Sequence, residues 1–105
     1  MAKWAHGITR TPLDMVKEFA VAMDQPLNQD WGFTTDLENM RFNLISEEYT
    51  EIENSDNKED MLKELADLVY VTYGYAATFG WDLDEAVKRV HESNMSKLDE
   101  DGKPT

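Results

Sequence analysis

Two pairs of carboxylates recur at helical spacing in the middle of the chain. Glu48 and Glu51 lie three residues apart, and so do Glu64 and Asp67. Residues three apart on a helix are neighbours, with roughly 5–6 Å between their Cβ atoms. If the two helices that carry these pairs are antiparallel neighbours, all four side chains can converge on one site.

Converging carboxylates need a partner, because ionised acids in a partly buried site repel one another strongly. Protonation relieves this repulsion, and so does a divalent cation. Mg²⁺, with Mn²⁺ as a possible substitute, takes oxygen ligands, keeps several waters and contacts substrate phosphates. The chain has no cysteine and only two histidines, His6 and His91, which argues against zinc. The alternative is that the acids line a solvated helix face.

The positions of these acids separate them from the many surface acids of the chain. On a helical wheel of about 100° per residue, Glu48 falls inside the apolar arc that runs from Leu44 to Ile45, and Glu51 falls near its edge. Asp67 is the only charged residue in the run 65–79. Soluble helices normally keep ionisable side chains off their apolar face, so the pattern favours a functional site.

Four helical segments must position these residues. Thr11 followed by Pro12 indicates the start of the first segment, and Asp82 with Glu85 indicates the start of the fourth. The segments cover about residues 12–25, 35–54, 58–79 and 83–98. No stretch shows convincing strand alternation, so we expect an all-α fold that resembles a four-helix bundle. We expect one domain over residues 1–105, with loose ends at 1–10 and 99–105.

Charge and composition exclude several classes of partner. The 105 residues carry a formal net charge of −12, which repels nucleic-acid polymers and anionic membranes. The longest uncharged run, 68–81, is too short to span a bilayer. The lack of cysteine and of a signal-peptide pattern favours a cytoplasmic location. The third segment is apolar on nearly all sides, so we expect a homo-oligomer.

The carboxylate spacing resembles a family signature. The run EEYTE at residues 47–51 followed by ELAD at 64–67 is similar to the EExxE…ExxD motif of the MazG-like, all-α nucleoside triphosphate pyrophosphohydrolases. RFNLISEE at 41–48, and residues 63–104 with SNMSK and DGKP, extend the resemblance. It implies hydrolysis of a nucleoside triphosphate, often a deoxynucleotide, to the monophosphate and pyrophosphate. It also implies dimers or dimers of dimers, and Mg²⁺ held by Glu48, Glu51, Glu64 and Asp67.

Five further residues are candidates for the reaction. Glu47 lies beside the predicted ligands and could orient or deprotonate the attacking water, or it is an exposed helix acid. Asn94 and Lys97, three residues apart at the end of the fourth segment, are candidates for phosphate contacts, as is Lys103 in the tail. Arg41, on the face that carries the motif, either pairs with a carboxylate or reaches phosphate.

Two other functions fit the same residues. The first is a phosphoribosyl-ATP pyrophosphohydrolase, which shares the architecture and the metal chemistry and would accept only phosphoribosyl-ATP. The second is a non-catalytic helical interaction module, whose acids form a solvated or regulatory metal-binding face. An assay with a panel of nucleotides separates these possibilities.

Overall fold

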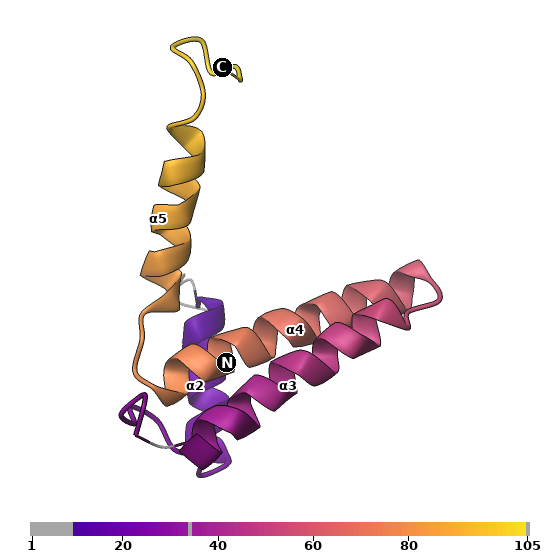
Figure 1. Cartoon of the computed structure of the whole chain (residues 1–105), viewed down its shortest axis with the longest axis vertical. Coiled ribbons are helices and arrows are strands. Elements are labelled where there is room, and N and C mark those ends of the chain that lie inside the picture. The colour runs from indigo at the N-terminus through magenta and orange to yellow at the C-terminus, as the bar shows by residue number, and fades with distance from the viewer. Residues whose placement is uncertain (1–9, 34, 105) are drawn as a thin grey trace.

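The computed structural model describes residues 10–33 and 35–104 of the chain. This part contains the helices α2 (Pro12–Ala22), α3 (Thr35–Glu53), α4 (Lys58–Thr78) and α5 (Leu83–Met95), and it contains no strand (Figure 1). The predicted all-α class is therefore confirmed. Most of the N-terminal end that the sequence predicts to be loose, residues 1–9, lies outside the described residues. None of the described helices is long and apolar enough to cross a membrane.

Local signals set the starts of α2 and α5, as predicted. The Thr11 side chain accepts a hydrogen bond from the backbone N–H of Asp14, whose carboxylate accepts one from the N–H of Thr11, each at 3.2 Å. Pro12 occupies the first turn, where its missing N–H costs no hydrogen bond. Asp82 caps α5 by accepting from the N–H of Glu85 at 3.1 Å. Both caps satisfy N–H groups that the helix itself leaves unpaired.

The helices α3 and α4 lie side by side as a hairpin, and α2 crosses α4 near its C-terminal end (Figure 1). The buried core joins α2 to this end of α4. Its apolar members are Leu13, Val16, Ala20, Tyr73, Ala76, Ala77 and Phe79. The C-terminal half of α4 is thus buried, whereas its N-terminal half carries the acids Glu64 and Asp67.

The helix α5 runs away from the α3–α4 hairpin and buries none of its residues (Figure 1). Its apolar stripe is open to solvent in the single chain, with Val87 and Val90 exposed to 49% and 60%. After α5, the carboxylate of Asp99 accepts hydrogen bonds from the backbone N–H groups of Asp101 and Lys103, each at 2.9 Å. The C-terminal segment predicted to be loose therefore contains a hydrogen-bonded turn.

The loop that follows α2 packs against the end of α4. The backbone N–H of Gln29 donates to the carbonyl of Thr78 at 2.7 Å, which satisfies one of the last carbonyls of α4. The indole N–H of Trp31 donates to the hydroxyl of Tyr75 at 2.8 Å, and the rings of Trp31 and Trp81 lie 5.8 Å apart. These contacts fix the direction in which the chain leaves α4.

Gly80 is the residue at which this junction is most sensitive to substitution. Its φ is +73°, and a Cβ atom added there would lie 2.8 Å from Oδ1 of Asn28. We expect Gly80→Ala to lower the free energy of unfolding by about 2 kcal/mol, because the left-handed conformation costs an L-residue about 1–2 kcal/mol and the clash adds to it. Denaturant titration measures this loss.

Gly102 provides the matched control for this prediction. Its φ of +76° is nearly the same, but nothing lies within 4 Å of the added Cβ atom. Gly102→Ala should therefore lose only the conformational part. Equal losses in the two variants would show that the contact with Asn28 does not constrain Gly80.

Candidate metal centre

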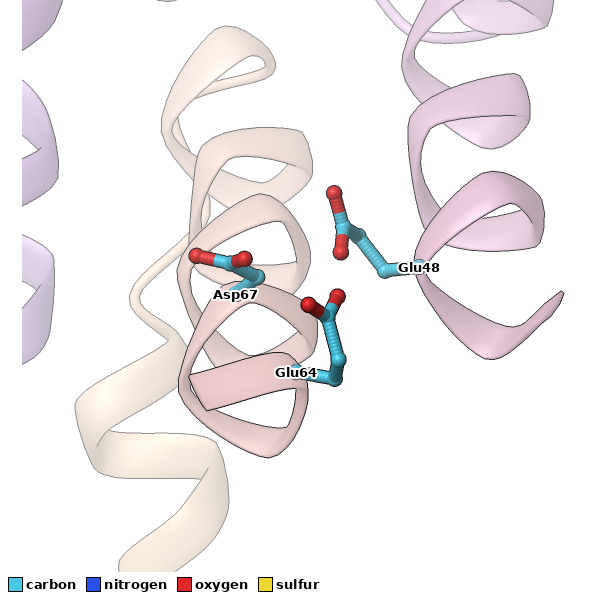
Figure 2. A group of neighbouring side chains, drawn as sticks. All are labelled: Glu48, Glu64 and Asp67. Atoms are coloured by element: carbon cyan, nitrogen blue, oxygen red, sulfur yellow. The ribbon is translucent and has the colours of Figure 1, made fainter. Parts of the chain in front are cut away.

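The structure brings together three of the four predicted carboxylates. Glu48 extends from α3, and Glu64 and Asp67 extend from neighbouring turns of α4, so that their carboxylates point toward one another (Figure 2). One oxygen of each lies within 4.8 Å of the others. We call these three residues the acidic trio.

The burial pattern of α3 explains why Glu48 faces α4. Arg41 is buried, and Leu44, Ile45, Glu48 and Ile52 are half-buried, so these residues form the covered side of the helix. Their spacing of three and four residues keeps them on one face. The apolar stripe of α3 therefore delivers a carboxylate to the helix–helix interface, where the acids of α4 meet it.

The environment of Glu48 is unfavourable for a charged carboxylate. Its Oε2 atom is inaccessible to solvent and has no hydrogen-bond partner among the described residues. Burial raises the pKa of Glu48, and the nearby Asp67 and Glu64 raise it further. An orphaned oxygen that faces two more acids is a group that needs either a proton or a cation.

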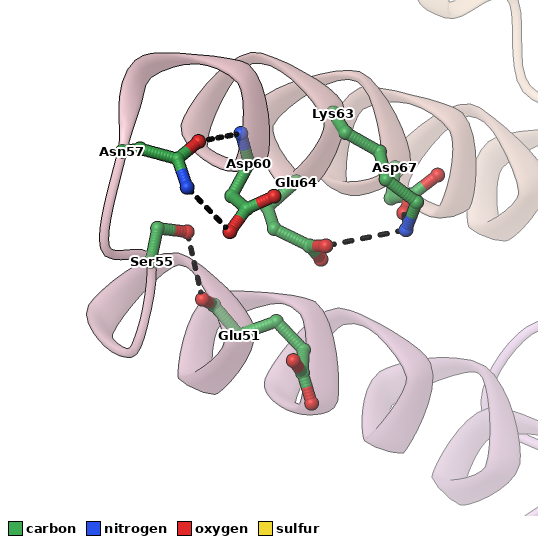
Figure 3. Close-up of polar contacts among 7 residues, drawn as sticks. All are labelled: Glu51, Ser55, Asn57, Asp60, Lys63, Glu64 and Asp67. Atoms are coloured by element: carbon green, nitrogen blue, oxygen red, sulfur yellow. Dashed lines mark hydrogen bonds and ion pairs between the residues drawn. The ribbon is translucent and has the colours of Figure 1, made fainter.

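Among the described residues, Lys63 is the cation that reaches the acidic trio. The ammonium of Lys63 donates to a carboxylate oxygen of Asp67 at 2.9 Å and to one of Glu64 at 3.2 Å (Figure 3). These two hydrogen bonds, with the charges of the same carboxylates, raise the pKa of Lys63. Sequence reasoning missed this residue, although a Lys four positions before an Asp on a helix is a recognisable ion-pair spacing.

The donor set of the acidic trio fits a hard divalent metal ion. All three donors are carboxylate oxygens, which are the ligands that Mg²⁺ and Mn²⁺ prefer. Two oxygens on opposite sides of one Mg²⁺ lie about 4.2 Å apart, because each bond is about 2.1 Å long. The trio spans at most 4.8 Å, so small side-chain rotations would suffice to bring its oxygens to bonding distance.

Two acids of the predicted site lie on α3 but outside the trio. Glu51 is exposed, and its backbone carbonyl accepts a hydrogen bond from the Ser55 hydroxyl at 3.0 Å. In Figure 3 the carboxylate of Glu51 points away from Glu64. Glu47, the candidate base, is exposed beside Glu48. The role of each in the reaction stays a prediction.

Arg41 is buried, and its guanidinium forms no ion pair with a carboxylate in the described part of the chain. Only 8% of the residue is exposed, and in the described part of the chain no acid lies within ion-pair distance of it. One terminal nitrogen donates to the amide oxygen of Gln25 at 3.3 Å, whereas Nε has no partner there. Burial lowers the pKa of the guanidinium. One of the two roles predicted for Arg41 was an ion pair with a carboxylate. No such pair is present within the described chain.

Arg41 lines a cavity of about 140 Å³ between α2, α3 and α4. The rings of Phe19 and Tyr70 meet edge to face beside it, with their centroids 6.1 Å apart. Leu44 and Val71 also line the cavity, and each lies one helical turn from a member of the acidic trio. The cavity and the trio are therefore adjacent along the α3–α4 interface.

The other predicted phosphate contacts are not beside the trio in one chain. The ammonium of Lys97 donates to the side-chain oxygen of Asn94 at 3.2 Å, at the end of α5. Lys103 follows in the turn after that helix. Figure 1 shows this end of α5 and the tail well away from the α3–α4 hairpin.

Comparison with known proteins adds an independent line of support for this chemistry. The sequence profile of the phosphoribosyl-ATP pyrophosphohydrolase family matches residues 16–94, which include the whole acidic trio and most of the described helices. A search of curated proteins found no match. The matched family is related to the MazG-like enzymes, and its members hydrolyse a phosphoanhydride bond of a nucleotide-like substrate. Because the match covers most of the chain, this protein belongs to the phosphoribosyl-ATP pyrophosphohydrolase family.

Proposed function

We propose that this protein is a metal-dependent pyrophosphohydrolase that converts a nucleoside triphosphate to the monophosphate and pyrophosphate. The observation that carries the proposal is the acidic trio with its orphaned Glu48 oxygen. Carboxylates repel a polyphosphate, so a trio that serves this substrate class needs a cation between the two. Deoxynucleoside triphosphates are the first candidates, because the sequence resembles enzymes that often act on them.

The trio is the proposed site for Mg²⁺, or for Mn²⁺ in its place. Glu48, Glu64 and Asp67 would hold the ion, and Glu51, one turn after Glu48, is the proposed fourth ligand. A bound ion would neutralise negative charge on the phosphate oxygens. Together the four acids would supply hard oxygen donors for it.

Other residues of the chain would position the reactants. Glu47 is exposed next to the trio, so its carboxylate is free to accept a proton from the attacking water and to orient it. Arg41, with its unpartnered Nε, would donate to an oxygen of the nucleotide held in the adjacent cavity. Asn94, Lys97 and Lys103 would contact the phosphates bound by a second copy of the chain.

We also propose self-association, which the apolar side chains left exposed by one chain support. Phe42, Leu62, Leu65, Val69 and Val90 are all exposed, and they lie on α3, α4 and α5. Such a surface on a monomer is a marker of an interaction site. A homodimer or a dimer of dimers would cover it. We also place the protein in the cytoplasm, because its sequence has no cysteine.

Phosphoribosyl-ATP is the second candidate substrate. It is favoured by the description of the family whose profile matches residues 16–94. It carries the same triphosphate group, so the acidic trio alone serves both substrates equally well. The two candidates differ in the groups that the cavity beside Arg41 would have to accept.

The test is pyrophosphate release from a panel of nucleoside triphosphates, deoxynucleoside triphosphates and phosphoribosyl-ATP. Each substrate is assayed with Mg²⁺, with Mn²⁺ and with excess chelator. We expect release that requires the metal and is fastest with deoxynucleoside triphosphates. Release from phosphoribosyl-ATP alone would establish the second candidate. The absence of pyrophosphate release from every substrate would contradict both enzymatic candidates. It would favour the non-catalytic interaction module.

A further inference from the structure

We propose that Lys63 is a built-in counter-ion of the acidic trio, which competes with the metal ion for its oxygens and moves to the substrate phosphates when the ion binds. This inference rests on the proposed function. It assigns to Lys63 a part in coupling metal binding to substrate binding.

Within the described part of the chain, the ammonium of Lys63 contacts only the two carboxylates of α4. The ammonium lies 2.9 Å from Asp67 and 3.2 Å from Glu64, and the Lys63 side chain is 69% exposed. The Glu64 side chain, in contrast, is only 13% exposed. Ion pairs of an exposed lysine are worth little free energy, so the ammonium can leave at small cost.

Competition follows because the two cations need the same two carboxylates. The oxygens of Asp67 and Glu64 that could hold a metal ion belong to the carboxylates that accept from Lys63. An ammonium and a divalent ion repel each other at such distances. Binding of the ion therefore requires Lys63 to swing out, and the lost ion pairs reduce the affinity of the empty site for metal.

The released ammonium stays close to the site. It is joined by a flexible four-carbon stem to a backbone position next to Glu64. A polyphosphate that arrives with the metal is the strongest anion that would then be within its reach. Lys63 thus opposes metal binding when substrate is absent and stabilises the phosphates when substrate is present, which makes the two binding events cooperative.

The experiment measures Mn²⁺ binding by electron paramagnetic resonance on the full chain, without nucleotide, in the wild type and in Lys63→Met, Lys63→Arg and Lys88→Met. Loss of an exposed ion pair should tighten Mn²⁺ binding by Lys63→Met about two- to fivefold. Lys88→Met removes an exposed lysine on α5 and should match the wild type. Lys63→Arg keeps the competing cation and should also bind Mn²⁺ as the wild type does.

The second measurement is calorimetric titration of the Mn²⁺-saturated proteins with inorganic pyrophosphate. We expect weaker pyrophosphate binding by Lys63→Met and recovery of affinity in Lys63→Arg. Unchanged Mn²⁺ affinity in Lys63→Met, or unchanged pyrophosphate affinity, would overturn the inference while the proposed function stands. Failure of the wild type to bind Mn²⁺ would instead overturn the proposed function, and the role of Lys63 with it.

Discussion

Glu48→Gln is expected to abolish metal-dependent pyrophosphate release and, at the same time, to stabilise the metal-free protein at neutral pH. A metal ion contributes several kcal/mol of charge stabilisation in such reactions, so loss of the proposed ligand Glu48 should reduce turnover by about 10³-fold or more. The neutral amide removes the repulsion of Glu48 by Asp67 and Glu64. Gains of this kind are about 0.5–2 kcal/mol, or several degrees in Tm.

The pH dependence of stability follows from the raised pKa of Glu48. A group that binds its proton more tightly in the folded state contributes its full stability below the unfolded pKa. That contribution is lost as the pH rises through the folded pKa. The stability gap between Glu48→Gln and the metal-free wild type should therefore be widest at neutral pH. It should close as the pH falls toward 4.5, the ordinary value for the group. Thermal unfolding across a pH series checks this.

Glu53→Gln is the matched control for both effects. Glu53 is an exposed acid at the end of the same helix and lies outside the trio. The variant should keep its turnover and its pH profile. A Glu48→Gln protein that retains turnover would remove Glu48 from the metal site, and a fall in its Tm at neutral pH would contradict the repulsion argument.

Arg41→Met is expected to increase stability and to weaken nucleotide binding. The guanidinium is buried with one long hydrogen bond to Gln25 and an unpartnered Nε, so its desolvation is poorly compensated. Replacing a buried ion pair by apolar side chains of similar volume often stabilises a protein by about 1–4 kcal/mol, and we expect a gain of this order for a guanidinium that lacks a carboxylate partner. The cavity would lose its buried donor and with it the proposed contact to the nucleotide. Denaturant titration and a nucleotide-binding titration measure the two effects.

Arg89→Met provides the comparison for this second prediction. Arg89 is exposed on α5, where it pairs only with Glu85 in the described chain, at 3.2 Å. Its replacement should change stability by less than about 1 kcal/mol and leave nucleotide binding intact. If Arg41→Met instead destabilised the protein and bound nucleotide normally, Arg41 would be a packing residue and its role in substrate binding would be wrong.

Local sequence signals were sufficient for the helices and for the three acids of the trio. Thr11 and Asp82 identify helix starts because capping depends only on residues three positions away. Glu48 stood out because it interrupts an apolar face, and that face packs as the periodicity predicts. Glu51 lies near the edge of the same arc, where a wheel cannot decide between the interface and solvent. The structure places it on the solvent side.

The contacts between helices could not be predicted from the same local signals. The stripe of α5 predicts that Val87 and Val90 will be covered, but periodicity does not say whether the cover comes from this chain, and in this chain they are exposed. The cavity beside Arg41 arises from the crossing of three helices. The ion pair of Lys63 with Asp67 is local to α4, but the place of Lys63 beside three acids depends on the hairpin that brings Glu48 to Glu64 and Asp67.

The division of α4 into two halves has a consequence for local opening of the fold. The buried apolar residues of α4 lie at positions 73–77, whereas the trio lies in the half of the α3–α4 hairpin that neither α2 nor α5 covers. Segments with few buried contacts open with a smaller free energy than the core does. Amide protons near the hairpin turn should therefore exchange faster than those of residues 73–77. An ion shared by both helices would slow exchange in the hairpin and leave the core unchanged.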